Sequence, residues 1–414
     1  MKHPDTVLLN VAALDDRIRE LGLKRSWIAD QIRIDRKTMT RWLTGQTKRI
    51  HVDNLNRLAA LLDCNPRELV QSETGEVFAT AADQSLAARL IAQENLLEIL
   101  TPTGKWPLLE GLIKAAMKPD LPLALLGQLY NCLAIAAWRQ SKLDPAEEYT
   151  RRALSLGQQS GHKATIARAK LNEATVLSFR GRVKEAITAY RYCVDSRQYL
   201  DETVSASALS NLGSVYWEYG DFNASLHYQD EAIACFSRLK MALNLAIAWI
   251  GRAATLVDMN RFAEAWSSIQ TALLHTERGS WQRGFGDAYL VAAKINARQG
   301  DPAEARRFFD MAAERFATLG IVEARTVAIE GLVLRVEGKW SQARSRLELA
   351  EKLNPDFPIS KTEVLREFLE LAVALDDHRL WAAKRETLRI LYLACGCDGW
   401  LARLGESDPF PSLR

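Results

Sequence analysis

One short sequence pattern recurs every 38 to 40 residues over more than half of the chain. In each copy, a corner residue is followed five and twelve positions later by a small residue. The corners are Ser141, Gly181, Gly220, Asn260, Gly300 and Gly338. A helix pair that turns at each corner places these small residues where two helices approach closely. Because one such pair cannot bury its apolar face alone, the pairs must stack, and the pattern predicts an α-solenoid.

The clearest copy is LSNLGSVYWEYGDFNASLHYQDEAI, which begins at Leu209. It resembles the tetratricopeptide repeat, and the matching residues are Leu212-Gly213, Tyr216, Gly220-Asp221-Phe222, Tyr228 and Ala232. Ser225 stands where the family has a packing alanine, and the period exceeds the family's value of about 34, which longer helices would explain. The resemblance implies an all-α fold in which residues 85–358 form a right-handed tetratricopeptide-like solenoid.

The segments that flank the repeats complete the expected domain organisation. Residues 1–72 read as a separate N-terminal domain and residues 73–84 as a linker. After the repeats, residues 359–414 contain two amphipathic segments, near 362–376 and 379–395. We expect these segments to form capping helices and a candidate dimer contact, because exposed apolar faces remain at the ends of a solenoid.

The N-terminal domain carries a concentrated positive charge. Residues 24–49 contain eight Lys and Arg against two Asp, which indicates either a polyanionic partner or a solvated basic face. Apolar spacing predicts four helices and a short fifth that starts at Pro66. Asp35 is the expected N-cap of the third helix and Gly45 its end. In that helix Met39, Trp42 and Leu43 face inward.

Two short helices joined by a tight turn, the second with a basic outer face, have the geometry of a helix-turn-helix. Residues 22–70 resemble the lambda-repressor-like (XRE-type) family through GLKRSWIADQI, DRKTMTRWLTGQ and VDNLNRLAALLDCNPRELV. One departure is Arg33, which occupies the turn position where the family has glycine. The resemblance implies base contacts from Arg36, Lys37, Thr40 and Arg41, and phosphate contacts from Lys24, Arg25, Lys48 and Arg49.

The first helices of stacked repeats line a concave surface, which predicts a ligand groove. Transferring the family's concave positions onto this chain gives Asn131, Trp138, Arg139, Arg168, Asn172, Asn211, Trp217, Lys294, Arg298, Arg325 and Arg335. Asn172 and Asn211 hold the same helix position in successive repeats. In this family that position often binds a peptide backbone, although asparagine there can also serve only to cap a helix.

Several kinds of chemistry have no sequence signal. The chain lacks a GxxxxGK or GxGxxG phosphate loop and any HxxxH pair, so we expect no enzyme activity, no cofactor and no metal site.

The uncharged stretch Leu121–Trp138 contains Pro122, Gly127, Gln128 and Asn131 and is expected to be a buried helix and not a membrane span. Six scattered Cys and the absence of a signal peptide favour a cytoplasmic protein with reduced thiols.

A lambda-repressor-like domain followed by tetratricopeptide repeats is similar to the RRNPP-type peptide-responsive transcription regulators of bacteria. The resemblance implies a homodimer that binds double-stranded DNA and receives a peptide or protein ligand in the solenoid groove. One alternative is a tetratricopeptide scaffold that recruits a protein partner, with the helix-turn-helix as a tether. A regulator of a neighbouring operon, of the phage-repressor or antitoxin type, is a variant of the first interpretation.

Overall fold

The structure is a computed structural model that describes residues 6–70, 81–92, 105–118, 120–278, 281–353 and 358–406. The chain divides into two compact units, and the main division falls within helix α5 (Ala81–Ile91). Most of the predicted linker 73–84 lies outside the described residues, and its last residues begin α5.

The N-terminal unit contains the helices that the sequence predicts. They are α1 (Val11–Glu20), α2 (Arg25–Gln31), α3 (Arg36–Leu43), α4 (Val52–Leu61) and the short 3-10 helix η1 (Pro66–Leu69). Their core includes Leu14, Ile28, Met39, Trp42 and Leu58, all buried. The inward orientation predicted for Met39 and Trp42 is therefore confirmed.

Two details of this unit differ from the sequence prediction. The spacing of Leu14, Ile18 and Leu21 predicts one apolar stripe on the first helix, but Leu21 is 40% exposed, because the helix ends at Glu20. Strands β1 (Thr6–Leu8) and β2 (Arg49–His51) form an antiparallel pair, with Val7 opposite Ile50. Three residues are too few to show the alternation by which a strand is recognised.

The turn between α2 and α3 depends on a strained residue. Arg33 adopts a φ of 59°, in the left-handed region that glycine occupies most easily. The amide of Ile34 donates to the carbonyl of Ala29 at 3.0 Å and closes the turn. The turn therefore keeps the left-handed conformation even though arginine replaces the glycine of the resembled family.

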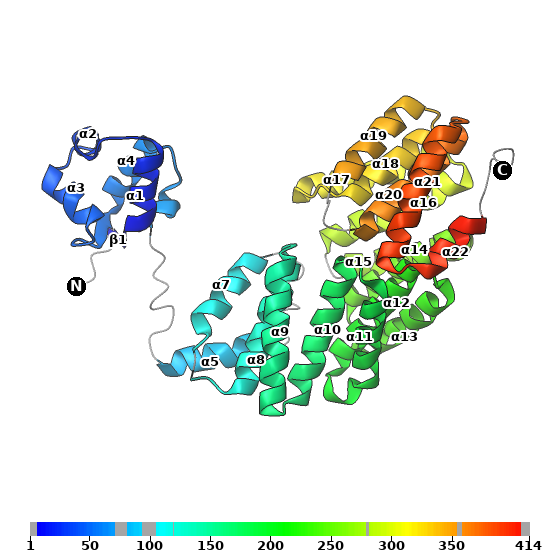
Figure 1. Cartoon of the computed structure of the whole chain (residues 1–414), viewed down its shortest axis with the longest axis horizontal. Coiled ribbons are helices and arrows are strands. Elements are labelled where there is room, and N and C mark those ends of the chain that lie inside the picture. Colours follow the sequence, from blue (N-terminus) through cyan, green and yellow to red (C-terminus); the bar gives the residue numbers. More distant parts are fainter. Residues whose placement is uncertain are drawn as a thin grey trace. The chain divides into compact units, whose positions relative to one another are not determined.

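The second unit is a stack of antiparallel helix pairs (Figure 1). Its elements are α7 (Trp106–Ala116), α8 (Leu123–Trp138), α9 (Leu143–Ser160), α10 (Lys163–Phe179), α11 (Val183–Asp195), η3 (Arg197–Tyr199), α12 (Glu202–Tyr219), α13 (Phe222–Leu239), α14 (Ala242–Asp258), α15 (Phe262–Arg278), α16 (Gln282–Gln299), α17 (Pro302–Leu319), α18 (Ala324–Val336), α19 (Trp340–Lys352), α20 (Pro358–Ala374), α21 (His378–Cys395) and α22 (Asp398–Glu406). The stretch Leu121–Trp138 falls on α8, much of which is buried. No helix in the described ranges is both long and apolar enough to cross a bilayer.

Every predicted corner of the array turns in the same way. All six corner residues, from Ser141 to Gly338, have positive φ values between 58° and 96°. The small residues five and twelve positions after each corner are at most 1% exposed. A left-handed residue ends each first helix, and the small side chains allow the two helices of a pair to approach. The repeat prediction is confirmed.

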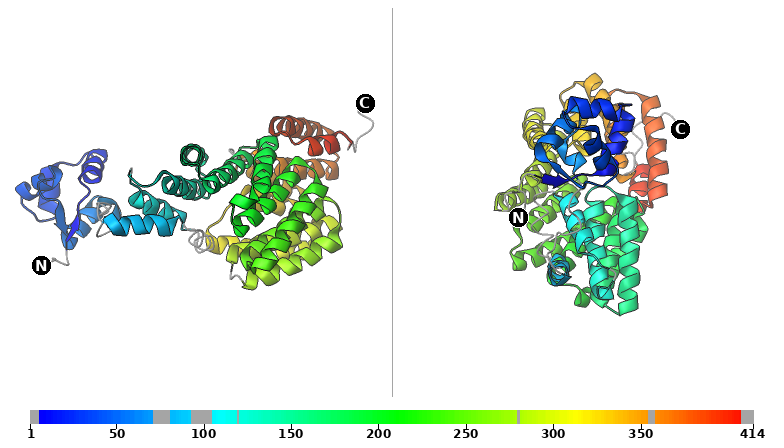
Figure 2. Two further views of the ribbon diagram at one scale, coloured as in Figure 1. Left: turned by 90° about the horizontal axis from the view of Figure 1, so that it is seen from below. Right: turned by 90° about the vertical axis from the view of Figure 1, so that its left-hand side faces the viewer.

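The C-terminal helices fold back along the array. In Figures 1 and 2 the red helices lie alongside the green helices of the middle repeats. The indole Nε1 of Trp400 donates to the carbonyl of Trp217 at 2.8 Å, and Lys184 forms a 2.8 Å ion pair with Asp398. Helix α22, which the sequence analysis did not predict, therefore packs against repeats that lie almost 200 residues earlier in the chain.

We expect Gly220→Ala to lower the free energy of unfolding more than Gly300→Ala does. Both glycines end a first helix with positive φ, 96° and 80°, so each alanine bears the ~1–2 kcal/mol cost of a left-handed backbone. A Cβ at Gly220 would lie 2.4 Å from the backbone nitrogen of Trp400, whereas one at Gly300 would meet no described atom within 4 Å. Denaturant unfolding of the two variants measures the difference. Equal losses would contradict the packing of α22 on this corner.

Candidate nucleic-acid interface and ligand pockets

Helix α3 presents the four residues expected to contact bases. Arg36, Lys37, Thr40 and Arg41 are all exposed, on the face opposite the buried Met39 and Trp42. The N-terminus of the helix is fixed by Asp35, whose carboxylate accepts from the Thr38 amide at 2.8 Å. Hydrogen bonds from the Thr38 hydroxyl and amide hold the pKa of Asp35 below its usual value, so the cap stays charged at neutral pH.

The four base-contact candidates differ in the ion pairs and hydrogen bonds that their side chains form within the unit. Arg36 lies 3.4 Å from Asp30, and both side chains are well exposed, so the pair contributes little and is readily displaced by phosphate. The Thr40 hydroxyl donates to the carbonyl of Arg36 at 2.9 Å, and its oxygen can still accept a hydrogen bond from another donor. No ion pair within the described part of this unit engages Lys37 or Arg41.

The expected phosphate contacts divide into two kinds. Lys24 and Lys48 are exposed, and no ion pair within the described residues of the unit holds either of them. Arg25, in contrast, pairs with Asp15 at 2.9 Å. Arg49 donates to the carbonyl of Thr6 at 3.0 Å across the strand pair. A duplex would have to compete for both arginines, and the two lysines are the better candidates for phosphate contact.

Trp27 is a surface residue that the sequence reasoning missed. It lies on α2 and is 43% exposed, although indoles are usually buried. The signal was available, because Ile28, Ala29 and Ile32 define the inward face of α2 and leave Trp27 outside that face. An exposed indole near Lys24 adds an apolar surface and an N–H donor next to a phosphate candidate.

A cavity of about 750 Å³ lies between the first helices of successive repeats, α8, α10, α12 and α14. We call it the α8–α14 pocket. Five predicted groove residues line it: Trp138, Arg139, Arg168, Asn172 and Asn211. Arg139 lies over the Trp138 ring, 4.4 Å from its centroid. Apolar and hydroxyl side chains, among them Phe179, Ile247 and Ser207, complete the wall.

The three predicted asparagines have different environments. Asn131 is fully buried, and its amide donates to the carbonyl of Thr165 at 3.1 Å. Its side chain therefore serves the packing of α8 on α10 and does not line the pocket, which corrects its assignment to the groove. Asn172 lies at the pocket wall, and its amide donates to the side-chain oxygen of Asn131 at 3.2 Å. Asn211 is partly exposed in the pocket.

Glu218 is an acidic residue on the wall of this pocket. Burial raises its pKa to about 8, although the Ser178 hydroxyl donates to its Oε2 at 2.9 Å and favours the ionised form. At neutral pH the carboxyl is therefore mostly protonated. The charged side chains of the pocket wall are then Arg139, Arg168 and Lys240, of which Arg168 pairs with Asp201 at 3.4 Å. This set favours a ligand with negative charge.

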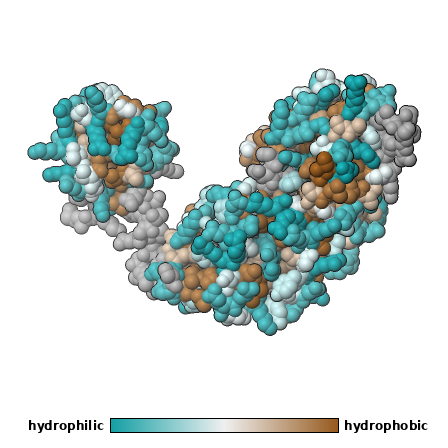
Figure 3. Space-filling model, in the orientation of Figure 1, coloured by the Kyte–Doolittle hydropathy of each residue, from teal (hydrophilic) through white to brown (hydrophobic). Residues whose placement is uncertain are grey.

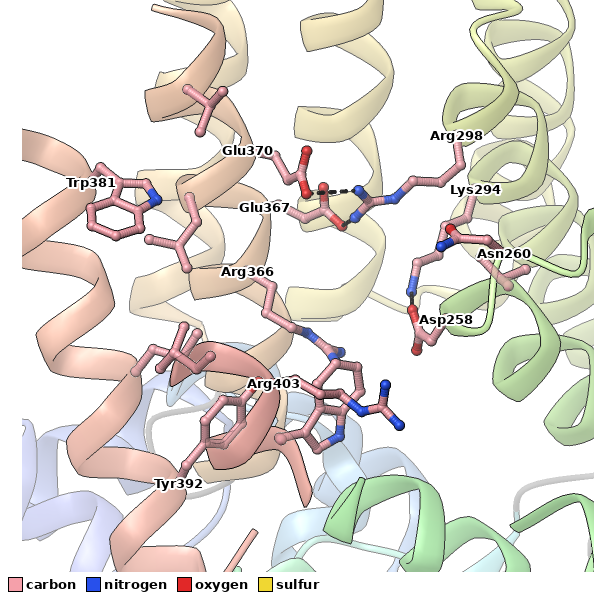
Figure 4. A pocket seen from close by; sticks show the side chains of 16 residues that line it. Asp258, Asn260, Lys294, Arg298, Arg366, Glu367, Glu370, Trp381, Tyr392 and Arg403 are labelled. Carbon is pink, nitrogen blue, oxygen red and sulfur yellow. Dashed lines mark hydrogen bonds and ion pairs between the residues drawn. The ribbon is translucent and has the colours of Figure 1, made fainter. Parts of the chain in front are cut away.

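A second cavity, of about 670 Å³, lies between α14 and α16 on one side and α20, α21 and α22 on the other. We call it the C-terminal pocket (Figure 4). It contains the predicted groove residues Lys294 and Arg298. Lys294 pairs with Asp258 at 3.1 Å, and Arg298 pairs with Glu367 at 2.8 Å. Burial alone would raise the pKa of Asp258, but the charges of Lys294 and Arg366 and the hydrogen bonds from Lys294 and Trp217 lower it to about 2.

The remaining predicted groove residues line neither cavity. Trp217 donates to Asp258 at 2.7 Å and packs edge-on against the ring of Trp400. Arg335 lies 4.0 Å from Glu370 of α20, and Arg325 is partly buried on α18. We expected these residues on an open groove, because the repeat pattern alone does not show that the C-terminal helices fold back along the array. Among the described residues, no group of three or more His, Cys, Asp and Glu side chains is arranged to hold a metal ion.

Comparison with known families identifies both parts of the chain. Residues 13–74 match the Cro/C1-type HTH DNA-binding domain, and residues 205–239 match the tetratricopeptide repeat. No curated protein matches the chain in sequence. The chain thus carries a Cro/C1-type helix-turn-helix domain followed by a tetratricopeptide-like helical array, as the sequence predicted.

Solved structures support the fold of the array. A Rap protein complexed with competence and sporulation factor has a TM-score of 0.60 at 16% identity, covering 79% of this chain and 92% of that one. Aspartyl phosphate phosphatase F from Bacillus subtilis has a TM-score of 0.54 at 11% identity, covering 93% and 95%. PlcR from Bacillus thuringiensis, solved with the peptide PapR7 and DNA, has a TM-score of 0.38 at 15% identity, covering 64% and 94%. The first two likenesses show a shared fold.

We expect Glu218→Gln to reduce the loss of stability between pH 6 and 9. The pKa of Glu218 is raised in the folded state to about 8, so the folded chain holds this proton more tightly than the unfolded chain. Its contribution to stability is complete below the unfolded pKa near 4.5 and is lost as the pH rises through 8, by at most ~1.4 kcal/mol per pH unit. Urea unfolding at several pH values measures the slope. Glu314→Gln, an exposed glutamate on α17, is the control, and equal slopes in wild type and Glu218→Gln would contradict the assignment.

Proposed function

We propose that this protein is a sequence-specific DNA-binding transcriptional regulator whose α8–α14 pocket senses a peptide or protein ligand. The observation that carries the proposal is the exposed face of α3, with Arg36, Lys37 and Arg41 on the recognition helix of a Cro/C1-type domain. The proposal gives the chain no catalytic step of its own.

The DNA contacts follow from the placement of these side chains. A recognition helix lies in the major groove, where an arginine can donate to both O6 and N7 of a guanine. Arg36 opens α3 and Arg41 lies more than one turn later, so the two can reach different base pairs. Lys24 and Lys48 would contact phosphates, which orient the domain without reading sequence.

A single domain of this kind reads one half-site, so the proposal includes a homodimer. The C-terminal helices remain the proposed contact. Figure 3 shows an apolar group over the region of α21, and Ile390 and Leu393 of that helix are each more than half exposed. Burying these side chains against a second copy would remove apolar surface from water.

The α8–α14 pocket has the composition of a site for a short peptide segment. Asn211 and the serine hydroxyls can hydrogen-bond a peptide backbone, Arg139 and Arg168 can bind a carboxylate, and the apolar wall can hold a side chain. Such a ligand regulates DNA binding only if it binds two arrangements of the protein with different affinity. If the array instead recruits a protein while DNA affinity stays constant, the scaffold interpretation applies.

Alanine substitutions should separate base reading from phosphate contact. Arg41→Ala is expected to cost roughly 1–3 kcal/mol of discrimination at one base-pair position of the selected site. Lys24→Ala is expected to weaken all sequences alike and to reduce the salt slope by about 1. Selection from random DNA followed by titrations at several salt concentrations measures both effects. Arg151→Ala, on an exposed face of α9, is the control, and no sequence preference in the wild type would refute the regulator.

Ligand sensing is tested on protein purified from its own host. Native mass spectrometry is expected to show a bound peptide that Arg139→Ala and Asn211→Ala each deplete severalfold, because both remove a polar group from the pocket wall. Arg151→Ala should keep the wild-type occupancy. A bound peptide that leaves the DNA affinity unchanged, or a pocket that is empty in every growth condition, would remove sensing from the proposal.

A further inference from the structure

The C-terminal pocket contains binding groups that its own ion pairs do not use. Lys294 is satisfied by Asp258, and Arg298 by Glu367 and, at 3.2 Å, by Glu370. These pairs occupy one part of the cavity in Figure 4, and the side chains of Arg366 and Arg403 extend into another part. The cavity shares no lining residue with the α8–α14 pocket.

Arg366 is an enclosed cation with an incomplete set of acceptors. Among the described ion pairs its partner is Glu363, at 3.8 Å, and the charges of Asp258 and Glu367 also favour its ionised form. Its Nη1 is nevertheless buried without a hydrogen-bond partner. The guanidinium lies over the ring of Trp400, 3.9 Å from the centroid, and this contact fixes its plane. A buried donor without an acceptor costs free energy, which a bound acceptor would recover.

Two further donors line the same cavity. Tyr392 is 1% exposed, and its hydroxyl has no hydrogen-bond partner among the described residues. Burial raises the pKa of this phenol, so the hydroxyl keeps its proton. Arg403 of α22 is exposed at the cavity, where its guanidinium lies over the ring of Phe222, and no carboxylate of the described chain pairs with it. Both side chains can donate to an oxygen in the cavity.

We propose that the C-terminal pocket binds a small oxyanion, a carboxylate or a phosphate, through Arg366, Arg403 and the hydroxyl of Tyr392. Two guanidinium groups and a neutral hydroxyl form a donor set that suits such oxygens, and charge-assisted hydrogen bonds of this kind are strong. Glu367 also leaves Oε2 buried without a donor, so a natural ligand would carry an N–H or O–H group beside the anion.

The position of the site gives the ligand a structural effect. Arg366 belongs to α20, Tyr392 to α21 and Arg403 to α22, while α14 and α16 form the opposite wall. A bound anion would therefore link these three helices. Because a ligand that binds only the folded state stabilises it by mass action, binding should raise the melting temperature of the chain.

The test uses the full chain with inorganic phosphate and, separately, succinate as probes, at an ionic strength held constant with potassium chloride. Calorimetric titration and thermal unfolding are expected to show saturable binding of at least one probe, and comparison of the two distinguishes phosphate from carboxylate as the preferred group. Tyr392→Phe should weaken binding about fivefold and Arg403→Gln about tenfold, because each removes one donor.

Tyr216→Phe is the matched control for Tyr392→Phe. The hydroxyl of Tyr216 is also buried without a partner, but the residue lines neither pocket, so this variant should bind the probes as the wild type does. Absence of saturable binding of both probes, or wild-type affinity in Tyr392→Phe and Arg403→Gln, would overturn the proposal. DNA binding is measured separately on the same proteins, so failure of the regulator assignment would leave this result interpretable.

Discussion

The close approach of paired helices, made possible by small residues, is the constraint on which the array depends. Ala146, Ala186, Ala265 and their equivalents are fully buried, and a larger side chain at any of them would push the two helices of a repeat apart. The left-handed corners stop each first helix at the point where its partner must begin. Together these features set the spacing of the first helices, and that spacing creates the α8–α14 pocket.

Much of the fold could be predicted because it is encoded locally and repeatedly. The corners at Gly181, Gly220, Asn260 and Gly300 follow one another at intervals of 39, 40 and 40 residues. Each corner residue is itself a signal for a turn. In the N-terminal unit, the role of Asp35 as a helix cap and the core position of Trp42 could also be predicted from the sequence, since both follow from helical periodicity. The strand pair was missed because Thr6–Leu8 is too short to show a period.

The ligand sites were harder to predict, because they depend on contacts between distant segments. The family's concave positions include Arg139 and Asn211, which line the α8–α14 pocket, but the same rule placed Trp217 in an open groove. That error came from α22, where Trp400, Leu401 and Leu404 have the spacing of a short amphipathic helix that could have been recognised. Even if this helix had been predicted, sequence periodicity would not have shown which earlier repeat it contacts.

The docking of α22 on α12 has a mechanical consequence. In a superhelical stack whose last helix is free, the pitch at each junction between repeats can change independently of the other junctions. Here the contact of Trp400 with Trp217 joins the ends of the segment from α12 to α22, so these repeats form a closed loop. A change of pitch at one junction of this loop must therefore be compensated at the other junctions or must break the contact of Trp400 with Trp217.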